Sequence, residues 1–302
     1  MKEKILVTGG TGYIGSHTVV ELQNAGYEVV IIDNLSNSSA DVVDNIEKVS
    51  GIRPAFEKLD CLDYAGLDAV FAKYKGIKAI IHFAASKAVG ESVEKPLLYY
   101  RNNLVSLINL LELMPKHGVE GIVFSSSCTV YGQPDHLPVT EEAPIKKAES
   151  PYGNTKQINE EIVRDTVASG APINAILLRY FNPIGAHPSG KIGEDPNGIP
   201  NNLVPYIAKV AVGKLEKVHV YGNDYPTPDG TGVRDYIHVV DLARGHVAAI
   251  KKLEEKPGLF ICNLGTGHGY SVLDMVHAFE KATGKKVPYK MAPRRAGDVA
   301  EV

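Results

Sequence analysis

A glycine-rich turn close to the N-terminus constrains the fold more than any other stretch. Apolar residues 5–7 predict a buried strand, and residues 13–25 predict a helix. Four glycines join the two: Gly9, Gly10, Gly12 and Gly15. Glycine allows the backbone to turn tightly and approach a pyrophosphate, and the helix N-terminus offers N–H groups to phosphates. The stretch therefore predicts a dinucleotide-binding site.

The residue that ends the second apolar run indicates which dinucleotide would bind. Residues 28–32 predict a strand, and Asp33 follows it near the distance expected for a carboxylate that binds the adenosine ribose hydroxyls. A carboxylate there disfavours a 2′-phosphate, so NAD is favoured over NADP. The alternative is a purely structural turn in which Asp33 only caps the backbone.

The composition of the 302 residues excludes several classes of protein. A net charge of −3 implies no general attraction to nucleic acid or membranes, and no apolar stretch is long enough to span a bilayer. The N-terminus enters a strand directly, without a signal peptide. Cys61, Cys128 and Cys262 lie far apart, which suits reduced thiols better than disulfides or a metal site. We therefore expect a cytoplasmic protein without a metal ion.

Apolar runs alternate with helical patterns through residues 1–180. Strands are expected at residues 4–8, 28–32, 54–59, 77–83, 120–126 and 173–180. The clearest helices between them are expected at 96–117 and 151–169. This alternation predicts an α/β fold, a Rossmann-type doubly wound parallel sheet that binds NAD.

The texture of the sequence changes at residue 181. Residues 182–202 are rich in Pro, Gly and Asn, which is typical of a long functional loop. Shorter elements follow, with helices expected near 203–213, 241–253 and 271–283 and strands near 217–221 and 258–263. Residues 181–302 are therefore predicted to form a smaller C-terminal α/β substrate lobe, which closes over the carboxyl ends of the strands.

Two motifs carry the chemistry. The expected strand at 120–126 runs into three serines, the last of them Ser127, and Tyr152 and Lys156 stand four residues apart on one helical face. A free phenol titrates near pH ~10, so a base at neutral pH needs nearby positive charge, and each unit of lowering requires about 1.4 kcal/mol. Lys156 and an oxidised nicotinamide would supply that charge. Tyr152 would then remove a hydroxyl proton while Ser127 holds the reacting oxygen.

Each motif alone is weak. A tyrosine and a lysine at this spacing are usually a surface pair, and a strand that ends in serines is usually structural. Their occurrence behind a dinucleotide turn, in this order, favours catalysis.

The sequence resembles the extended short-chain dehydrogenase/reductase family, and within it the UDP-hexose 4-epimerases. The matching stretches are residues 7–17, 33–38, 82–87, 124–132, 150–156, 179–183 and 222–239. The resemblance implies an isomerase of galactose metabolism with a tightly held NAD. Tyr152 would take the proton of the sugar 4-hydroxyl, and a 4-keto sugar would turn over before hydride returns, so that UDP-galactose and UDP-glucose interconvert. A homodimer through the helices near 96–117 and 151–169 is also implied.

The resemblance further implies which residues hold the two ligands. The implied NAD contacts, besides Tyr152 and Lys156, are Gly9, Gly12, Tyr13, Ile14, Gly15, Asp33, Asn34, Leu35, Ser36, Asn37, Ser38, Asp60, Cys61, Phe83, Ala84, Ala85, Ser86, Lys87, Asn102, Tyr180 and Phe181. The implied UDP-sugar contacts, besides Ser127 and Tyr152, are Asn182, Asn202, Leu203, Tyr221, Arg234, Arg295 and Asp298. The two arginines suit a diphosphate. Their alternative is a structural ion pair, since Asp235 follows Arg234.

Three other functions compete with this one. A sugar-nucleotide dehydratase needs an acid and a base directly after the catalytic hydroxyl, where this chain has Cys128 and Thr129. A simple alcohol dehydrogenase would release its reduced cofactor in each cycle. A nucleotide sensor would not need Ser127, Tyr152 and Lys156 together.

The chain departs from the family in two places. Cys128 stands where relatives usually carry a small residue such as alanine, and the chain stops early, so we expect a C-terminal element to be missing. Val302 falls at or near the position that limits the size of the sugar C2 group. A residue smaller than tyrosine there would admit N-acetylated sugars.

Overall fold

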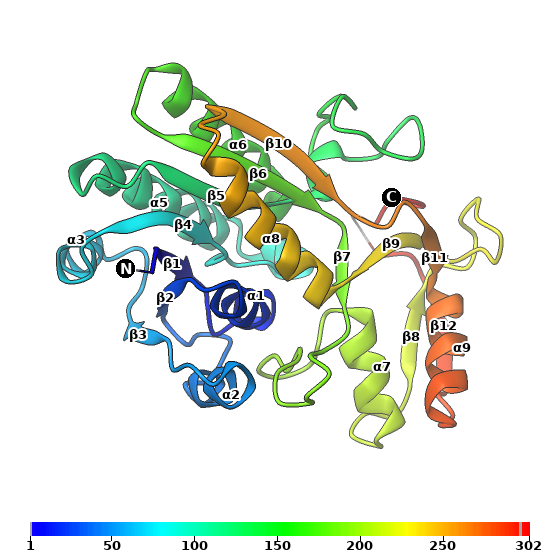
Figure 1. The fold of residues 1–302 in the computed structure, drawn as a ribbon. Coiled ribbons are helices and arrows are strands. Elements are labelled where there is room, and N and C mark those ends of the chain that lie inside the picture. Colours follow the sequence, from blue (N-terminus) through cyan, green and yellow to red (C-terminus); the bar gives the residue numbers. More distant parts are fainter. Residues whose placement is uncertain (1, 296–297) are drawn as a thin grey trace.

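A seven-stranded parallel sheet forms the centre of the structure, a computed structural model that describes residues 2–295 and 298–302 (Figure 1). In spatial order its strands are β10 (Leu259–Leu264), β6 (Asn174–Tyr180), β5 (Gly121–Ser127), β4 (Ile77–His82), β1 (Lys4–Thr8), β2 (Glu28–Asp33) and β3 (Ala55–Lys58). All neighbours pair in parallel, and the order reverses between β1 and β4. Ligands bind in the crevice at such a switch point. The predicted doubly wound fold is confirmed.

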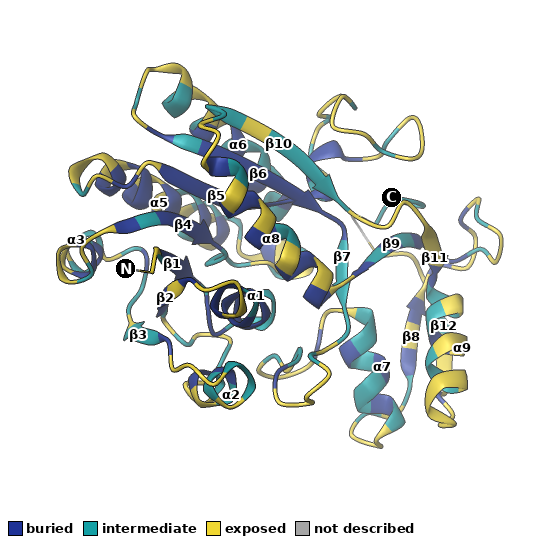
Figure 2. Cartoon of the chain, viewed as in Figure 1, coloured by how far each residue is buried: buried dark blue, intermediate teal, exposed yellow. Residues whose placement is uncertain are grey.

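The two faces of this sheet carry two separate apolar cores, because successive side chains of a strand point to opposite faces. Ile5 and Val7 join one core, whereas Leu6 joins the other. The first core is covered by α1 (Tyr13–Asn24), α2 (Asp41–Ser50) and α8 (Val239–Leu253). The second is covered by α3 (Tyr64–Lys73), α5 (Pro96–Lys116) and α6 (Pro151–Ala168). Figure 2 shows the buried strands between helices whose outer faces are exposed.

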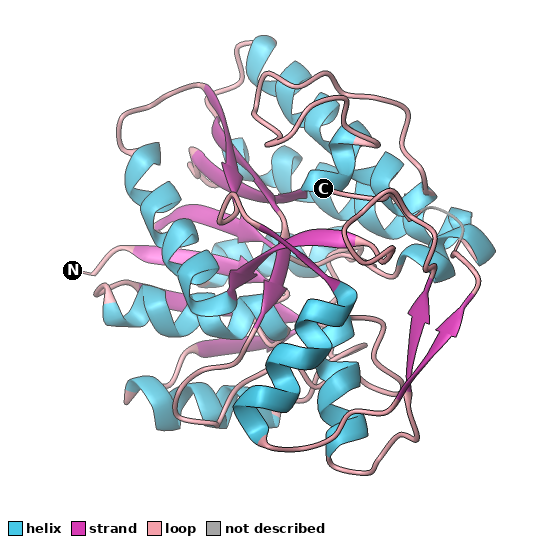
Figure 3. Ribbon diagram, turned by 90° about the vertical axis from the view of Figure 1, so that its right-hand side faces the viewer, coloured by secondary structure: helices cyan, strands magenta, loops and turns pink. Residues whose placement is uncertain are grey.

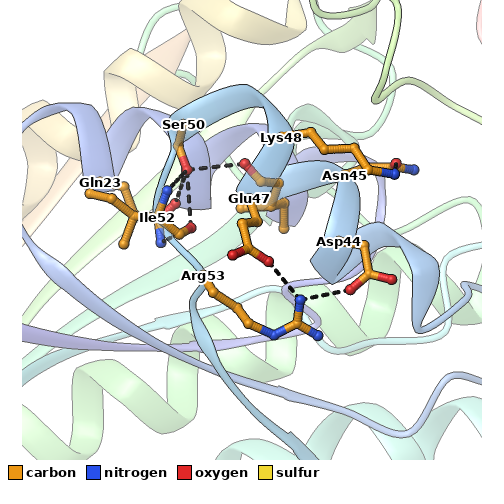
Figure 4. A network of polar contacts seen from close by, with 9 residues as sticks. Gln23, Asp44, Asn45, Glu47, Lys48, Ser50, Ile52 and Arg53 are labelled. Atoms are coloured by element: carbon orange, nitrogen blue, oxygen red, sulfur yellow. Dashed lines mark hydrogen bonds and ion pairs between the residues drawn. The ribbon is translucent and has the colours of Figure 1, made fainter.

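Local signals fix where several helices begin and how they are held. Ser150 caps α6 by accepting from the N–H of Gly153 (3.1 Å), and a proline stands at its first position. Arg53 follows α2 and pairs with Asp44 and Glu47 of that helix, each at 2.7 Å (Figure 4). These contacts secure the segment that follows the predicted ribose-binding loop.

A smaller body stands beside the carboxyl ends of the main strands (Figures 1 and 3). Its elements are β7 (Asn182–Ile184), α7 (Leu203–Ala211), β8 (Val218–Tyr221), β9 (Val233–His238), β11 (Gly269–Ser271), α9 (Val272–Thr283) and β12 (Tyr289–Ala292). β7, β9 and β11 form one sheet, and β8 pairs with β12. Its own apolar core includes Ile207, Val220 and Val276. The remaining short helices are α4 (Val89–Glu94) and η1 (Cys128–Tyr131).

The chain returns to the main sheet after residue 180, so the two bodies are not two consecutive halves of the sequence. β10 pairs with β6 along six residues, and α8 packs on α1 in the first core. By packing, these two elements belong with the predicted NAD-binding half, although they come after residue 181. In the part of the chain that the structure describes, no helix has the length and apolar character needed to cross a membrane.

Candidate active site

The glycine turn forms a cradle at the carboxyl edge of the sheet. Gly9 has a φ of +72°, and a Cβ on it would lie 2.8 Å from the nitrogen of Ala84. A Cβ on Gly15 would lie only 2.2 Å from the carbonyl oxygen of Gly9. Gly12 is the N-cap residue of α1 and has no side chain that could accept from the first N–H groups of the helix. These N–H groups therefore remain available to a ligand in the cradle. These features fit a dinucleotide pyrophosphate.

The predicted ribose-binding loops lie together beyond β2 and β3. The Asp33 carboxylate accepts from the N–H groups of Thr11 (3.2 Å) and Leu35 (2.9 Å). The Asn34 amide donates to the Asp60 carboxylate at 2.9 Å. The rest of the first loop contains the other predicted residues, Ser36, Asn37 and Ser38.

Cys61 occupies a different environment from its predicted neighbours. Its side chain is buried in the apolar core that contains Leu67, and its carbonyl accepts from the Asn109 amide (2.9 Å). Burial also raises the pKa of the thiol to about 12. The thiol is therefore part of the core and is not ionised at neutral pH.

The loop after β4 continues the cofactor edge of the sheet. It contains five predicted residues: Phe83, Ala84, Ala85, Ser86 and Lys87. Asn102 of α5 donates to the Ser86 hydroxyl at 3.0 Å, which orders this loop. The Lys87 ammonium group reaches Glu194 at 3.5 Å. Tyr13 donates to the carbonyl of Gly185 (2.7 Å), so α1 also touches the long loop after β7.

The three predicted catalytic residues converge where β5 ends. Ser127 is the last residue of β5, and its hydroxyl accepts from the N–H of Thr129 at 3.2 Å. The Lys156 ammonium group lies 5.9 Å from the centre of the Tyr152 ring and donates to the Ser125 carbonyl at 2.6 Å. Tyr152 and Lys156 therefore share the face of α6 that meets β5, as their spacing predicts.

Burial dominates the electrostatics of this group. It raises the pKa of Tyr152, while the Ser127 hydroxyl acts in the opposite direction. Burial also lowers the pKa of Lys156 to about 8, against the influence of Glu160. Desolvation outweighs the Ser127 hydroxyl, so the lowered pKa expected for Tyr152 requires positive charge from Lys156 and from a bound oxidised nicotinamide. The positive charge of an oxidised nicotinamide ring beside the phenol would lower the pKa of Tyr152 again.

A cavity of ≈ 470 Å³ opens beside this edge of the sheet. Its lining includes all seven residues predicted to contact the UDP-sugar outside the catalytic group: Asn182, Asn202, Leu203, Tyr221, Arg234, Arg295 and Asp298. Asn182 begins β7, one residue after Phe181 and two after the end of β6. The predicted substrate residues of the cavity therefore begin directly after the last predicted cofactor residues, Tyr180 and Phe181.

The two arginines of the cavity differ in their contacts. Arg234 donates to the carbonyls of Val233 (2.8 Å) and Val299 (2.9 Å), whereas the neighbouring Asp235 accepts from Thr266 instead. The simple ion pair within β9 is therefore not formed. Arg295 makes two bonds of 3.0 Å to Asp298. Its guanidinium group also lies 5.1 Å from the centre of the Tyr221 ring.

Comparison with known proteins identifies the family. The family model described as "NAD dependent epimerase/dehydratase family" matches residues 5–265. The UDP-glucose 4-epimerase of Bacillus subtilis is 60% identical over 98% of this chain and 87% of its own. The human UDP-glucose 4-epimerase is 58% identical over 99% of this chain and 88% of its own. The chain belongs to the NAD dependent epimerase/dehydratase family.

A solved structure supports the same family. The UDP-glucose 4-epimerase of Bifidobacterium longum, described in complex with NAD+ and UDP, superposes with a TM-score of 0.94. It is 53% identical, and the match covers 99% of this chain and 88% of that one.

The sequence analysis did not predict several residues that lie in or beside this site. Tyr236 and Tyr206 line the cavity, and Tyr236 lies on the same side of β9 as Arg234, two residues earlier. The alternation of a strand would have indicated Tyr236. Glu160 and Arg179 are buried beside the catalytic helix. The continuation of the four-residue spacing from Tyr152 and Lys156 would have indicated Glu160.

Proposed function

We propose that this chain is a UDP-glucose 4-epimerase, which interconverts UDP-galactose and UDP-glucose through a transient 4-keto sugar. The observation that carries the proposal is the convergence of Ser127, Tyr152 and Lys156 at the end of β5, in a fold that also has the glycine cradle and the ≈ 470 Å³ cavity. When bound, NAD supplies a hydride acceptor and donor. The relatives that cover almost the whole chain carry the same name.

The chain's own groups would manage the proton of the sugar 4-hydroxyl. Tyr152 takes that proton and later returns it, and Ser127 donates a hydrogen bond to the reacting oxygen. Lys156 stabilises the phenolate, because its ammonium group lies over the Tyr152 ring at 5.9 Å and is itself anchored to Ser125. The buried setting excludes water, which strengthens these interactions.

The cavity would hold the nucleotide while the sugar turns. Arg234 and Arg295 offer forked donors to a diphosphate, and Tyr221 and Tyr236 present aromatic surface to a base. A nucleotide bound away from the reacting carbon leaves the 4-keto sugar free to rotate without escape. Either face of the sugar then meets the same hydride position, as epimerisation requires.

The first experiment measures conversion of UDP-galactose to UDP-glucose without added cofactor. We expect conversion, and NAD in the supernatant after denaturation. Tyr152→Phe should lower kcat by roughly 10²- to 10⁴-fold and leave NAD bound. Tyr289→Phe, at a tyrosine 42% exposed, is the control and should act as wild type. Near-normal activity of Tyr152→Phe would contradict the assigned base.

We also propose that the enzyme admits N-acetylated sugars. Val302 packs in a cluster with Cys128, Tyr131 and Phe181, close to the catalytic serine, and its carbonyl accepts from the N–H of Asp235 (3.1 Å). A small side chain in this place leaves room near the sugar. Val302→Tyr should abolish turnover of UDP-N-acetylgalactosamine and spare UDP-galactose, and a wild type inactive on the N-acetylated sugar rules the idea out.

A homodimer in the cytoplasm completes the proposal. α5 carries four exposed apolar side chains, Leu97, Leu98, Val105 and Ile108, which are 82%, 49%, 38% and 37% exposed. Burial of such residues against a second copy is favourable. The three cysteines are free thiols, which suits a reducing compartment.

A further inference from the structure

Glu160 lies on the catalytic helix α6, one turn beyond Lys156 and two turns beyond Tyr152. Tyr152, Lys156 and Glu160 follow one another at four-residue intervals on α6. The Lys156 ammonium group donates to the Ser125 carbonyl at 2.6 Å, and the Ser126 hydroxyl donates to the Glu160 carboxylate at 2.5 Å. The helix is thus fastened to β5 at adjacent residues, immediately before Ser127.

Glu160 is also paired with a buried arginine. Arg179 of β6 donates to its two carboxylate oxygens at 2.9 Å and 2.5 Å, and the two side chains are only 5% and 3% exposed. A third nitrogen of Arg179 donates to the Tyr131 hydroxyl (3.0 Å), which in turn donates to Asn263 of β10 (2.6 Å). β5 and β6 therefore contact this carboxylate directly, and η1 and β10 are connected to it through Arg179.

Stability alone does not account for this arrangement. Removing two charges from water costs several kcal/mol per ion, so a buried ion pair contributes little net stability compared with apolar residues of the same volume. It does fix geometry, since the planar guanidinium and carboxylate groups lock each other's orientation. The carboxylate that is fixed here is one helical turn from the ammonium group on which the reaction depends.

Among the residues that the structure describes, few charged groups surround the Lys156 ammonium group. Glu160 on its own helix favours the ammonium form against burial. His82 of β4 also faces it, but burial lowers the pKa of this imidazole to about 3, so His82 is neutral at working pH. Burial raises the pKa of both Tyr152 and Tyr180, so these phenols are neutral too. The charge of Arg179 is balanced by Glu160 itself.

We propose that Glu160 is a positioning residue for the epimerase reaction. With Arg179 and Ser126 it holds the face of α6 that carries Tyr152 and Lys156 against the end of β5. This inference rests on the proposed function.

The test compares Glu160→Gln with Glu161→Gln in the NAD-loaded enzyme. Glu161 is the next residue and is exposed, so its variant controls for a lost carboxylate on α6. Loss of the Glu160 charge leaves Arg179 unbalanced and disfavours the ammonium form of Lys156. We expect the alkaline limb of kcat/KM to move about one unit to lower pH, with KM for UDP-galactose changed less than about twofold. Glu161→Gln should keep the wild-type profile.

A second variant separates the positioning effect from the charge. Ser126→Ala keeps the ion pair but removes one fastening of α6, so kcat should fall roughly three- to tenfold at every pH with the limb unmoved. If Glu160→Gln does not fold with normal NAD content, Glu160→Asp takes its place. Glu160→Asp keeps the charge on a shorter side chain. We therefore expect kcat to fall by the same factor as in Ser126→Ala, while the alkaline limb of kcat/KM stays at the wild-type pH.

The outcomes are distinguishable. A wild-type enzyme that does not interconvert the two UDP-hexoses overturns the proposed function, and the positioning role with it. If the wild type is active, two results would overturn the positioning role alone. One is a Glu160→Gln variant whose kcat/KM keeps the wild-type alkaline limb. The other is a wild-type kcat in both Ser126→Ala and Glu160→Asp.

Discussion

At the scale of single residues, Lys156 shows how a site can place function above stability. Its side chain is 3% exposed, and burial lowers the pKa to about 8 from an ordinary value of 10.5. The folded protein therefore binds this proton less well than the unfolded chain between those two pH values. Below about pH 8 the burial cost is present in full, and it is relieved as the pH rises toward 10.5.

Lys156→Met should therefore inactivate the enzyme without weakening the fold. The substitution keeps the length of the side chain and removes the buried charge, so the free energy of unfolding at pH 7 should be equal or higher. At the same time kcat should fall at least roughly 100-fold. Urea unfolding and initial rates check the two effects, and a loss of more than about 1 kcal/mol in stability would show that the ammonium group is a net structural contact.

Gly15 gives a second prediction at this scale. Because a Cβ would lie 2.2 Å from the Gly9 carbonyl, Gly15→Ala must open the cradle, and NAD affinity should fall more than about tenfold. Gly90 is a matched control, since it lies in α4 and a Cβ there would meet no atom within 4 Å. Isothermal titration of the NAD-free proteins measures both. Equal affinities would mean that the turn does not approach the cofactor.

At the scale of elements, the long loop between β7 and α7 joins the two proposed ligand sites. Glu194, whose side chain is 8% exposed, accepts from Lys87 (3.5 Å) on the cofactor side and from Asn202 (2.5 Å) on the substrate side. Glu194→Gln should therefore raise KM for UDP-galactose several-fold and speed NAD release. Asp195→Asn is the control, because this neighbour is 91% exposed. Wild-type values for both variants would contradict a bridging role.

Elements also show how far the sequence determined the outcome. The strands of the main sheet, the long helices and the face shared by Tyr152 and Lys156 could be predicted, because each depends on a local period or a local cap. The sequence prediction missed β7, β9, β11 and β12, which pair only within the smaller body. The network of Glu160, Arg179 and Tyr131 could not be predicted, because it joins segments that meet only in the folded sheet. The same holds for the thiol of Cys61, which packs into the core with Leu67.

At the scale of the whole molecule, buried histidines set the response to acid. Burial lowers the pKa of His82 to about 3 and that of both His17 and His246 to about 4, from an ordinary 6.5. The unfolded chain therefore binds protons first, so stability is complete above about pH 6.5 and falls as the pH drops toward 4. Between pH 6.5 and 5 the three groups together should remove on the order of 5 kcal/mol.

Thermal unfolding of the NAD-saturated protein between pH 7.5 and 5 measures this loss. His246→Gln, which removes one of the three titrations, should reduce this pH dependence by about a third. An unchanged slope in this variant would assign the acid sensitivity to other groups.

The return of β10 to the main sheet has a consequence for how the protein can be divided. β10 covers the outer edge of β6 with six paired residues, so a fragment of residues 1–180 would expose that edge along its whole length. Uncovered strands recruit other chains, and we expect this fragment to accumulate as insoluble aggregates when expressed alone. The nucleotide-binding half is therefore not an autonomous folding unit, and a gene split at its apparent boundary should yield soluble protein only when both pieces are produced together.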